Sequence, residues 1–179
     1  SETVINTFVI GDLSVELYHK TDKGYELVNG STEVFEDEAL YEPGYTQVVY
    51  FKIKNAGTVP FDYKLSVIPS NIVIGTNVFG QNIDLRDHLK FGVVIADTES
   101  EVLAATQNRT EARKFADTAL SNYYKMKTDL AAGGEQYAAL VVYMPENVGN
   151  EANFRLKTPS VDLGVNVKAT QIEARGMLD

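Results

Sequence analysis

Apolar and polar residues alternate along several stretches of this chain, and this alternation constrains the fold more than any other feature. The stretch TQVVYFKIKN places Val49, Phe51 and Ile53 on one side, and LSVELY, FDYKLSVIP and LGVNVKATQ repeat the pattern. Because successive side chains of a β-strand point to opposite faces, each stretch predicts a strand with one apolar and one polar face. Such strands are typical of antiparallel sheets packed on one side, and two such sheets face to face form a sandwich.

The predicted fold is therefore mainly β, an antiparallel two-sheet sandwich. In the other three stretches the apolar faces, which we expect in the core, are Leu13, Val15 and Leu17; Tyr63, Leu65 and Val67; and Leu163, Val165, Val167 and Ala169. Ser66 and Asn166 fall on the opposite, polar faces of their strands. Turn signals such as Asn29-Gly30 separate the strands.

One interval, about residues 98–127, departs from the β pattern. It contains TESE and NRTE, and each fits a capping box, in which a capping side chain is followed three residues later by Glu. Helical spacing also links five residues between positions 108 and 124, namely Ala112, Phe115, Ala116, Ala119 and Tyr123. We therefore expect one or two short helices inserted between strands. NIDLRDHL, residues 82–89, predicts a further short helical turn.

Composition excludes several classes of function. The chain has 179 residues, which suits one domain, and a net charge of −9. No Lys/Arg cluster forms a basic stripe, so nucleic acid is not an expected partner. No apolar run approaches the roughly 20 residues of a membrane-spanning helix, so no membrane span is expected. Cysteine is absent, which excludes disulfides, thiolate zinc sites and cysteine nucleophiles.

The residues that carry most enzyme chemistry are sparse. The two histidines, His19 and His88, lie far apart and form no HExxH pair, and no GxSxG elbow supports a catalytic triad. Neither GxGxxG nor a P-loop is present, so no nucleotide cofactor is expected. Two metal sites stay open as alternatives: a mixed His/carboxylate site and a calcium site at Glu36-Asp37-Glu38 with Glu42. We expect that the chain is not an enzyme and that it binds neither a metal ion nor a cofactor.

Three segments together resemble the TasA/camelysin family, secreted proteins of Gram-positive bacteria that a dedicated signal peptidase releases. NTFVIGDLSVEL is similar to the NTF-x-x-G-x-L-x-L start of the mature proteins. EPGYTQVVYFKIKNAGTVPFDYKLSV resembles their Pro-Gly turn, strand, N-x-G turn and returning strand, and VNVKATQIEA resembles their terminal strand. The resemblance implies a jelly-roll sandwich, secretion to the cell surface, and a structural role in fibres or the biofilm matrix.

In fibre-forming relatives the N-terminal segment leaves its own subunit and completes the sheet of the next, so the implied partner is a second copy, head to tail. Other matrix or cell-surface proteins are further candidate partners. Carried over here, residues 1–10 form an N-terminal arm, and residues 11–179 form a single β-sandwich domain. The arm's apolar residues, which we expect to act as the donor strand, are Val4, Phe8 and Ile10 on one face and Ile5 and Val9 on the other. A strand that is apolar on both faces suits insertion better than exposure.

Three alternatives stay open. The arm is equally compatible with an ordinary first strand paired within its own domain. The chain could be a monomeric binding or adhesin module of the cell surface. Camelysin-type members are also classed as metallopeptidases, but no HExxH is present, so no catalytic residue is carried over to this sequence.

Overall fold

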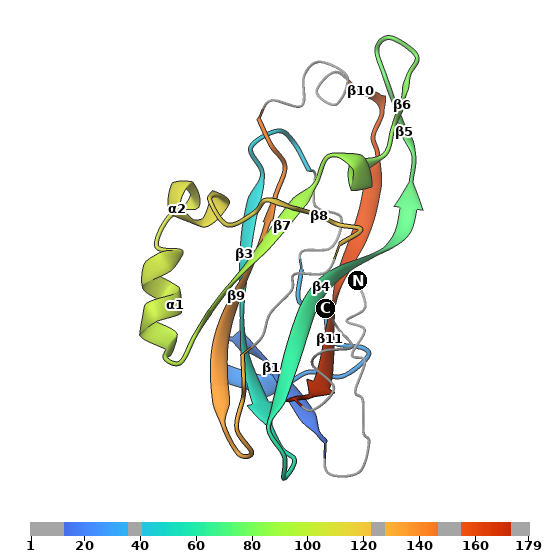
Figure 1. Ribbon diagram of the computed structural model, residues 1–179. Coiled ribbons are helices and arrows are strands. Elements are labelled where there is room, and N and C mark those ends of the chain that lie inside the picture. Colours follow the sequence, from blue (N-terminus) through green and yellow to red (C-terminus); the bar gives the residue numbers. More distant parts are fainter. Residues whose placement is uncertain (1–12, 36–40, 123–127, 147–154, 173–179) are drawn as a thin grey trace.

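The largest sheet in this computed structural model has six strands. The structure describes residues 13–35, 41–122, 128–146 and 155–172. Within them, the six-stranded sheet is antiparallel throughout, in the order β2-β1-β3-β9-β7-β8 (Figure 1). Its strands are β1 (Val15–Thr21), β2 (Gly24–Leu27), β3 (Thr46–Asn55), β7 (Lys90–Ala96), β8 (Thr118–Ala119) and β9 (Glu135–Tyr143).

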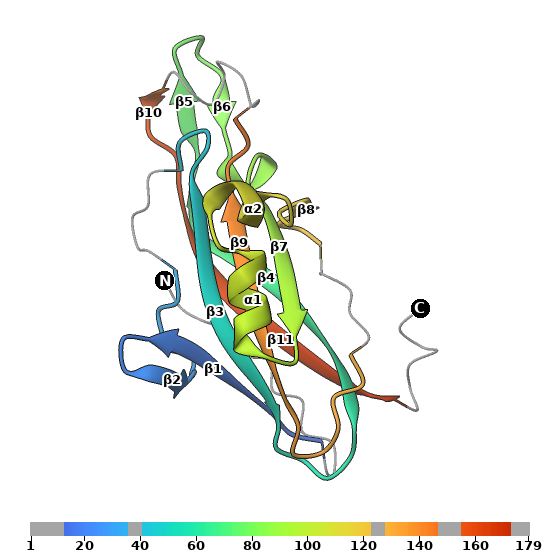
Figure 2. The same cartoon turned by 90° about the vertical axis from the view of Figure 1, so that its left-hand side faces the viewer.

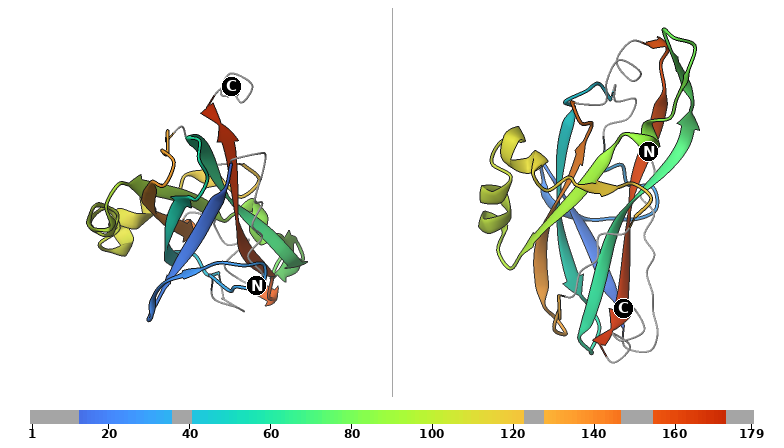
Figure 3. Two further views of the ribbon diagram at one scale, coloured as in Figure 1. Left: turned by 90° about the horizontal axis from the view of Figure 1, so that it is seen from below. Right: turned by 45° about the horizontal axis from the view of Figure 1, so that its top comes forward.

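A long antiparallel pair, β4 (Phe61–Val73) and β11 (Ser160–Gln171), forms a second layer. Figures 1 and 3 show this pair on one side of the molecule and β3, β9 and β7 on the other. Beyond the end of β4 the chain continues into a small sheet in the order β10-β5-β6. Its strands are β5 (Gly75–Asn77), β6 (Asn82–Ile83) and β10 (Arg155–Lys157). The described part is thus mainly β and antiparallel, as the alternation predicts.

The core lies between the two layers. All the apolar faces expected from alternation are buried, and one cluster joins Phe51 of β3 and Leu140 of β9 with Leu65 of β4 and Val165 of β11. Burying one such side chain contributes about 1.5–3 kcal/mol, so the period-2 pattern accounts for much of what holds the layers together.

Two short helices and one helical turn interrupt the strands, as expected. They are α1 (Glu99–Ala105), α2 (Arg109–Arg113) and the 3₁₀ turn η1 (Leu85–Asp87). Both predicted caps form: the Thr98 hydroxyl accepts from the Glu101 N–H at 3.4 Å, and Asn108 Oδ1 accepts from the Glu111 N–H at 2.9 Å. Figure 2 shows both helices over the outer face of the six-stranded sheet, where α1 contacts β7 and β9. No helix in the described ranges could span a membrane.

The helical spacing beyond Arg113 does not continue α2, which is a correction to the sequence prediction. After α2 the chain turns and crosses β7 at Gly92, where a β-carbon would lie 1.7 Å from the carbonyl oxygen of Phe115. It then forms β8 with Thr118 and Ala119 at the edge of the sheet. Glycine allows this close backbone approach, and pairing with β7 replaces further helical turns.

Candidate functional site

One edge of β4 has no strand partner along most of its length among the described residues, and a cavity lies beside it. β4 pairs with β11 along its length, from Phe61 opposite Gln171 to Val73 opposite Ser160. On its other edge, the N–H of Phe61 donates to the carbonyl of Leu130 at 3.0 Å, and the Leu130 N–H donates back at 2.8 Å. Phe61 therefore directs its backbone groups away from β11.

Alternate residues of an antiparallel strand direct their N–H and C=O groups to the same edge. Tyr63, Leu65 and Val67 accordingly present theirs on the Leu130 side, and no backbone group in the described ranges pairs with them there. Residues 123–127, which join the two ends of this edge in the chain, lie outside the described residues. Pro69 follows in the same series, and proline, which has no N–H, is typical of edge strands.

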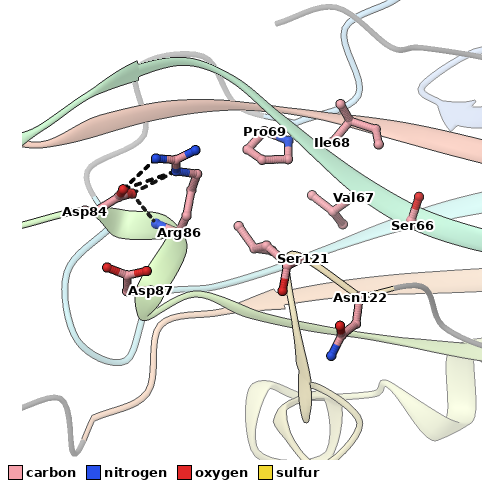
Figure 4. A pocket seen from close by; sticks show the side chains of 10 residues that line it. Ser66, Val67, Ile68, Pro69, Asp84, Arg86, Asp87, Ser121 and Asn122 are labelled. Atoms are coloured by element: carbon pink, nitrogen blue, oxygen red, sulfur yellow. Dashed lines mark hydrogen bonds and ion pairs between the residues drawn. The ribbon is translucent and has the colours of Figure 1, made fainter.

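A cavity of about 380 Å³ lies beside this edge. Its lining comes from four consecutive β4 residues (66–69), from η1 and its neighbour, and from residues 120–122 after β8 (Figure 4). Consecutive strand residues point to opposite faces, so a cavity that touches all four of them lies along the edge of β4 rather than over one face. The cavity therefore extends the free edge into a groove with side-chain walls.

An ion pair stands at one end of the cavity. The Arg86 guanidinium donates to Asp84 at 2.7 Å (Nη2 to Oδ2) and 3.0 Å (Nε to Oδ1), and Asp84 also caps η1 by accepting from the Arg86 N–H (Figure 4). The hydrogen bond from Arg86 holds the pKa of the Asp84 carboxyl below its usual value, against the opposing effect of burial. Asp84 and Arg86 thus neutralise each other, and Asp87 adds a further carboxylate at this end of the cavity.

Two buried polar groups face each other across the β4–β11 ladder, and one of them, Ser66, lines the cavity. Ser66 and Asn166 are cross-strand partners, only 3% and 5% exposed, although both were expected on solvent-facing polar faces. Ser66 Oγ and Asn166 Oδ1 have no hydrogen-bond partner among the described residues. Periodicity assigns a residue to one face of a strand, but it does not show whether a distant segment covers that face. In this structure both faces of β4 are buried from Phe61 to Tyr63 and from Leu65 to Val67.

The residues predicted to form the donor strand lie outside the described ranges: Val4, Ile5, Phe8, Val9 and Ile10. The division into an arm of residues 1–10 and a domain of residues 11–179 therefore stays a prediction. The acidic run Glu36-Asp37-Glu38 also lies outside the described residues.

The histidines are placed on different elements. His19 of β1 packs against Phe51, with ring centroids 5.6 Å apart, whereas His88 is the C-cap residue that directly follows η1. Across the parts of the chain that the structure describes, no group of three or more His, Asp or Glu residues is arranged to hold a metal ion. The described geometry is thus that of a strand edge with a cavity beside it, and the sequence pattern does not contain the strand order that places β4 there.

No family model matches the chain, and no curated protein matches it. The resemblance to TasA/camelysin proteins therefore stays a hypothesis that depends on three short segments.

Proposed function

We propose that this protein is a secreted structural protein of the cell surface or biofilm matrix, similar to TasA/camelysin proteins, that assembles into fibres by exchange of its N-terminal strand. The observation that carries the proposal is the free edge of β4, with three outward-directed backbone positions and a cavity beside it. An open edge supplies hydrogen bonds for an added strand, and the adjoining cavity supplies a place for its side chains.

The dimensions of donor and acceptor agree. Residues 3–10 would extend about 23 Å as a strand, at about 3.3 Å per residue, and the seven positions from Tyr63 to Pro69 span about 20 Å. The donor is uncharged over residues 3–10. The charged residues that line the cavity are Asp84 and Arg86, which pair with each other, and Asp87; Lys64 lies within the β4 stretch itself. Head-to-tail contacts of this kind do not close on themselves, so repetition would give a filament.

We further propose that the two layers form a jelly-roll sandwich. The support is the six-stranded sheet facing β4 and β11 across a shared core. The helices support the assembly proposal in a second way, because α1 and α2 lie on the outer face of the six-stranded sheet rather than along β4. Neither helix covers this edge, whose residues Tyr63, Leu65 and Val67 are at most 1% exposed within the subunit.

The first test compares the full chain with a chain that starts at Gly11, by size-exclusion chromatography with light scattering and by negative-stain microscopy. We expect filaments from the full chain and monomers from the shortened one. If both are stable monomers, the fibre proposal fails, and a monomeric surface-binding module becomes the better interpretation.

A second test locates the acceptor. A peptide of residues 1–12 is added to the chain that starts at Gly11, and amide hydrogen exchange is followed. We expect added protection at Tyr63, Leu65 and Val67, and none along β2, an edge strand that serves as the internal control. The same peptide with Phe8→Asp should protect neither edge. Protection of β2 instead of β4 would place the acceptor elsewhere.

A further inference from the structure

Exposed apolar side chains gather at one end of the molecule, on the small sheet of β5, β6 and β10. Phe79 and Val78 lie in the turn between β5 and β6 and are 62% and 47% exposed, and Leu156 of β10 is 72% exposed. Val73 and Ile74 precede β5 and are also exposed. Figure 1 shows this hairpin projecting beyond the rest of the fold, with β10 beside it. We call these five residues the apolar tip.

Charge is distributed unevenly around the apolar tip. Residues 65–83 contain no charged side chain, although the protein has a net charge of −9. The charged residues of the three-stranded sheet are Arg155 and Lys157, both basic and both in β10, on either side of Leu156. The tip thus has Lys157 as a basic neighbour, on a protein whose net charge is negative.

The turn that carries Phe79 satisfies its own backbone. Asn77 is fully buried, and its Oδ1 accepts from the N–H groups of Phe79 at 3.0 Å and Gln81 at 2.9 Å. The N–H of Asn77 donates to the Gln81 carbonyl, and that of Gly80 donates to the Asn77 carbonyl. Gly80 has φ +78°, a left-handed conformation that glycine adopts at little cost. Four N–H groups of the turn are therefore bonded internally, which lowers the cost of moving it out of water.

We infer that the apolar tip docks on an anionic lipid surface, with Phe79, Val78 and Leu156 entering the interfacial region of the bilayer and Lys157 contacting phosphate groups. Such binding grows with the apolar area buried and with attraction between basic residues and anionic lipids, and the tip offers both. A stable protein interface buries about 800 Å² on each partner, more than five partly exposed side chains supply. The inference does not depend on whether the chain forms fibres.

Flotation with vesicles tests the inference on the full chain, because floating vesicles separate from any fibres, which sink. The vesicles are phosphatidylcholine alone or phosphatidylcholine with about a third phosphatidylglycerol. We expect the protein to float with the anionic vesicles and to be released by high salt. Phe79→Asp should reduce the floated fraction at least about tenfold, and Lys157→Glu should reduce it less.

Leu27→Asp is the matched control, because Leu27 of β2 is 56% exposed and lies outside the tip. It should float as the parent does. The chain has no tryptophan, so Phe79→Trp supplies a single reporter whose emission should shift to the blue when anionic vesicles are added. Flotation that Phe79→Asp leaves unchanged, or no flotation with either vesicle, would overturn the inference. Concentration-dependent self-association that Phe79→Asp abolishes, without vesicle binding, would instead assign the tip to a second copy.

Discussion

Ser66 and Asn166 face each other across the β4–β11 ladder, and each buries an oxygen that has no hydrogen-bond partner among the described residues. An unsatisfied buried polar group costs about 1–3 kcal/mol. Because both residues are at most 5% exposed, this cost falls on the folded subunit itself.

Ser66→Ala removes one of these groups, and we therefore expect the isolated subunit to become more stable by about 1 kcal/mol. Urea unfolding followed by circular dichroism measures this. Ser70→Ala, on the same strand, is the control and should stay within about 0.5 kcal/mol of the parent. Destabilisation by Ser66→Ala would show that the hydroxyl has a partner in solution.

Gly92→Ala should destabilise the fold by about 3 kcal/mol or more, because the new methyl group would meet the carbonyl of Phe115 at 1.7 Å and backbone has to move. Gly30→Ala is the matched control, since a β-carbon there meets nothing within 4 Å. Thermal unfolding of both variants gives the comparison. Equal melting temperatures would mean that the chain after α2 does not cross β7 at Gly92.

Arg113 links α2 to the sheet through three contacts. Its Nε donates to the Thr46 hydroxyl at 2.7 Å, and its Nη2 donates to the Gly44 carbonyl. Its guanidinium also lies over the Tyr143 ring. Lysine has no planar fork, so Arg113→Lys should still cost about 1–2 kcal/mol. The neighbouring Lys114 pairs with Glu111 in solvent, and Lys114→Ala should change stability by less than about 0.5 kcal/mol. Chemical denaturation distinguishes the two; an equally small effect of both would contradict this role of Arg113.

His19 should make stability depend on pH. Burial lowers the pKa of the imidazole, and its cross-strand partner Glu26 opposes this with a smaller upward effect. In the unfolded chain the imidazole has an ordinary pKa of about 6.5, so it binds a proton more readily than in the folded protein. The contribution of neutral His19 to folding stability is therefore present above about pH 6.5 and is lost as the pH falls towards the pKa of the folded state. NMR titration measures the imidazole pKa, and Glu26→Gln should lower it further. An increase would contradict the assignment.

Local patterns predicted the faces of strands and the starts of helices, because both depend on neighbours in sequence. Val49, Phe51 and Ile53 alternate into the core as a strand requires, and Thr98 and Asn108 cap the helices as their boxes indicate. These features need no knowledge of which strands meet.

The helix predicted after Arg113 was wrong because the prediction used only neighbours in sequence. Phe115 and Ala116 fit helical spacing, but the chain there follows the pairing of β8 with β7 and the close approach at Gly92. The predicted donor residues of the arm lie outside the described ranges, so that part of the candidate site stays a prediction. The unpaired edge of β4, which we propose as the acceptor, could not be predicted at all.

By itself, the sequence determined an acidic, cysteine-free chain of antiparallel strands with one apolar face each. Only the tertiary structure decided that β4 lies at an edge, that α1 and α2 cover the outer face of the other sheet, and that an uncharged hairpin projects with Phe79 at its turn. The physical reason is that alternation reports the environment of each strand's two faces, whereas edges and exposed tips depend on contacts between residues far apart in the chain.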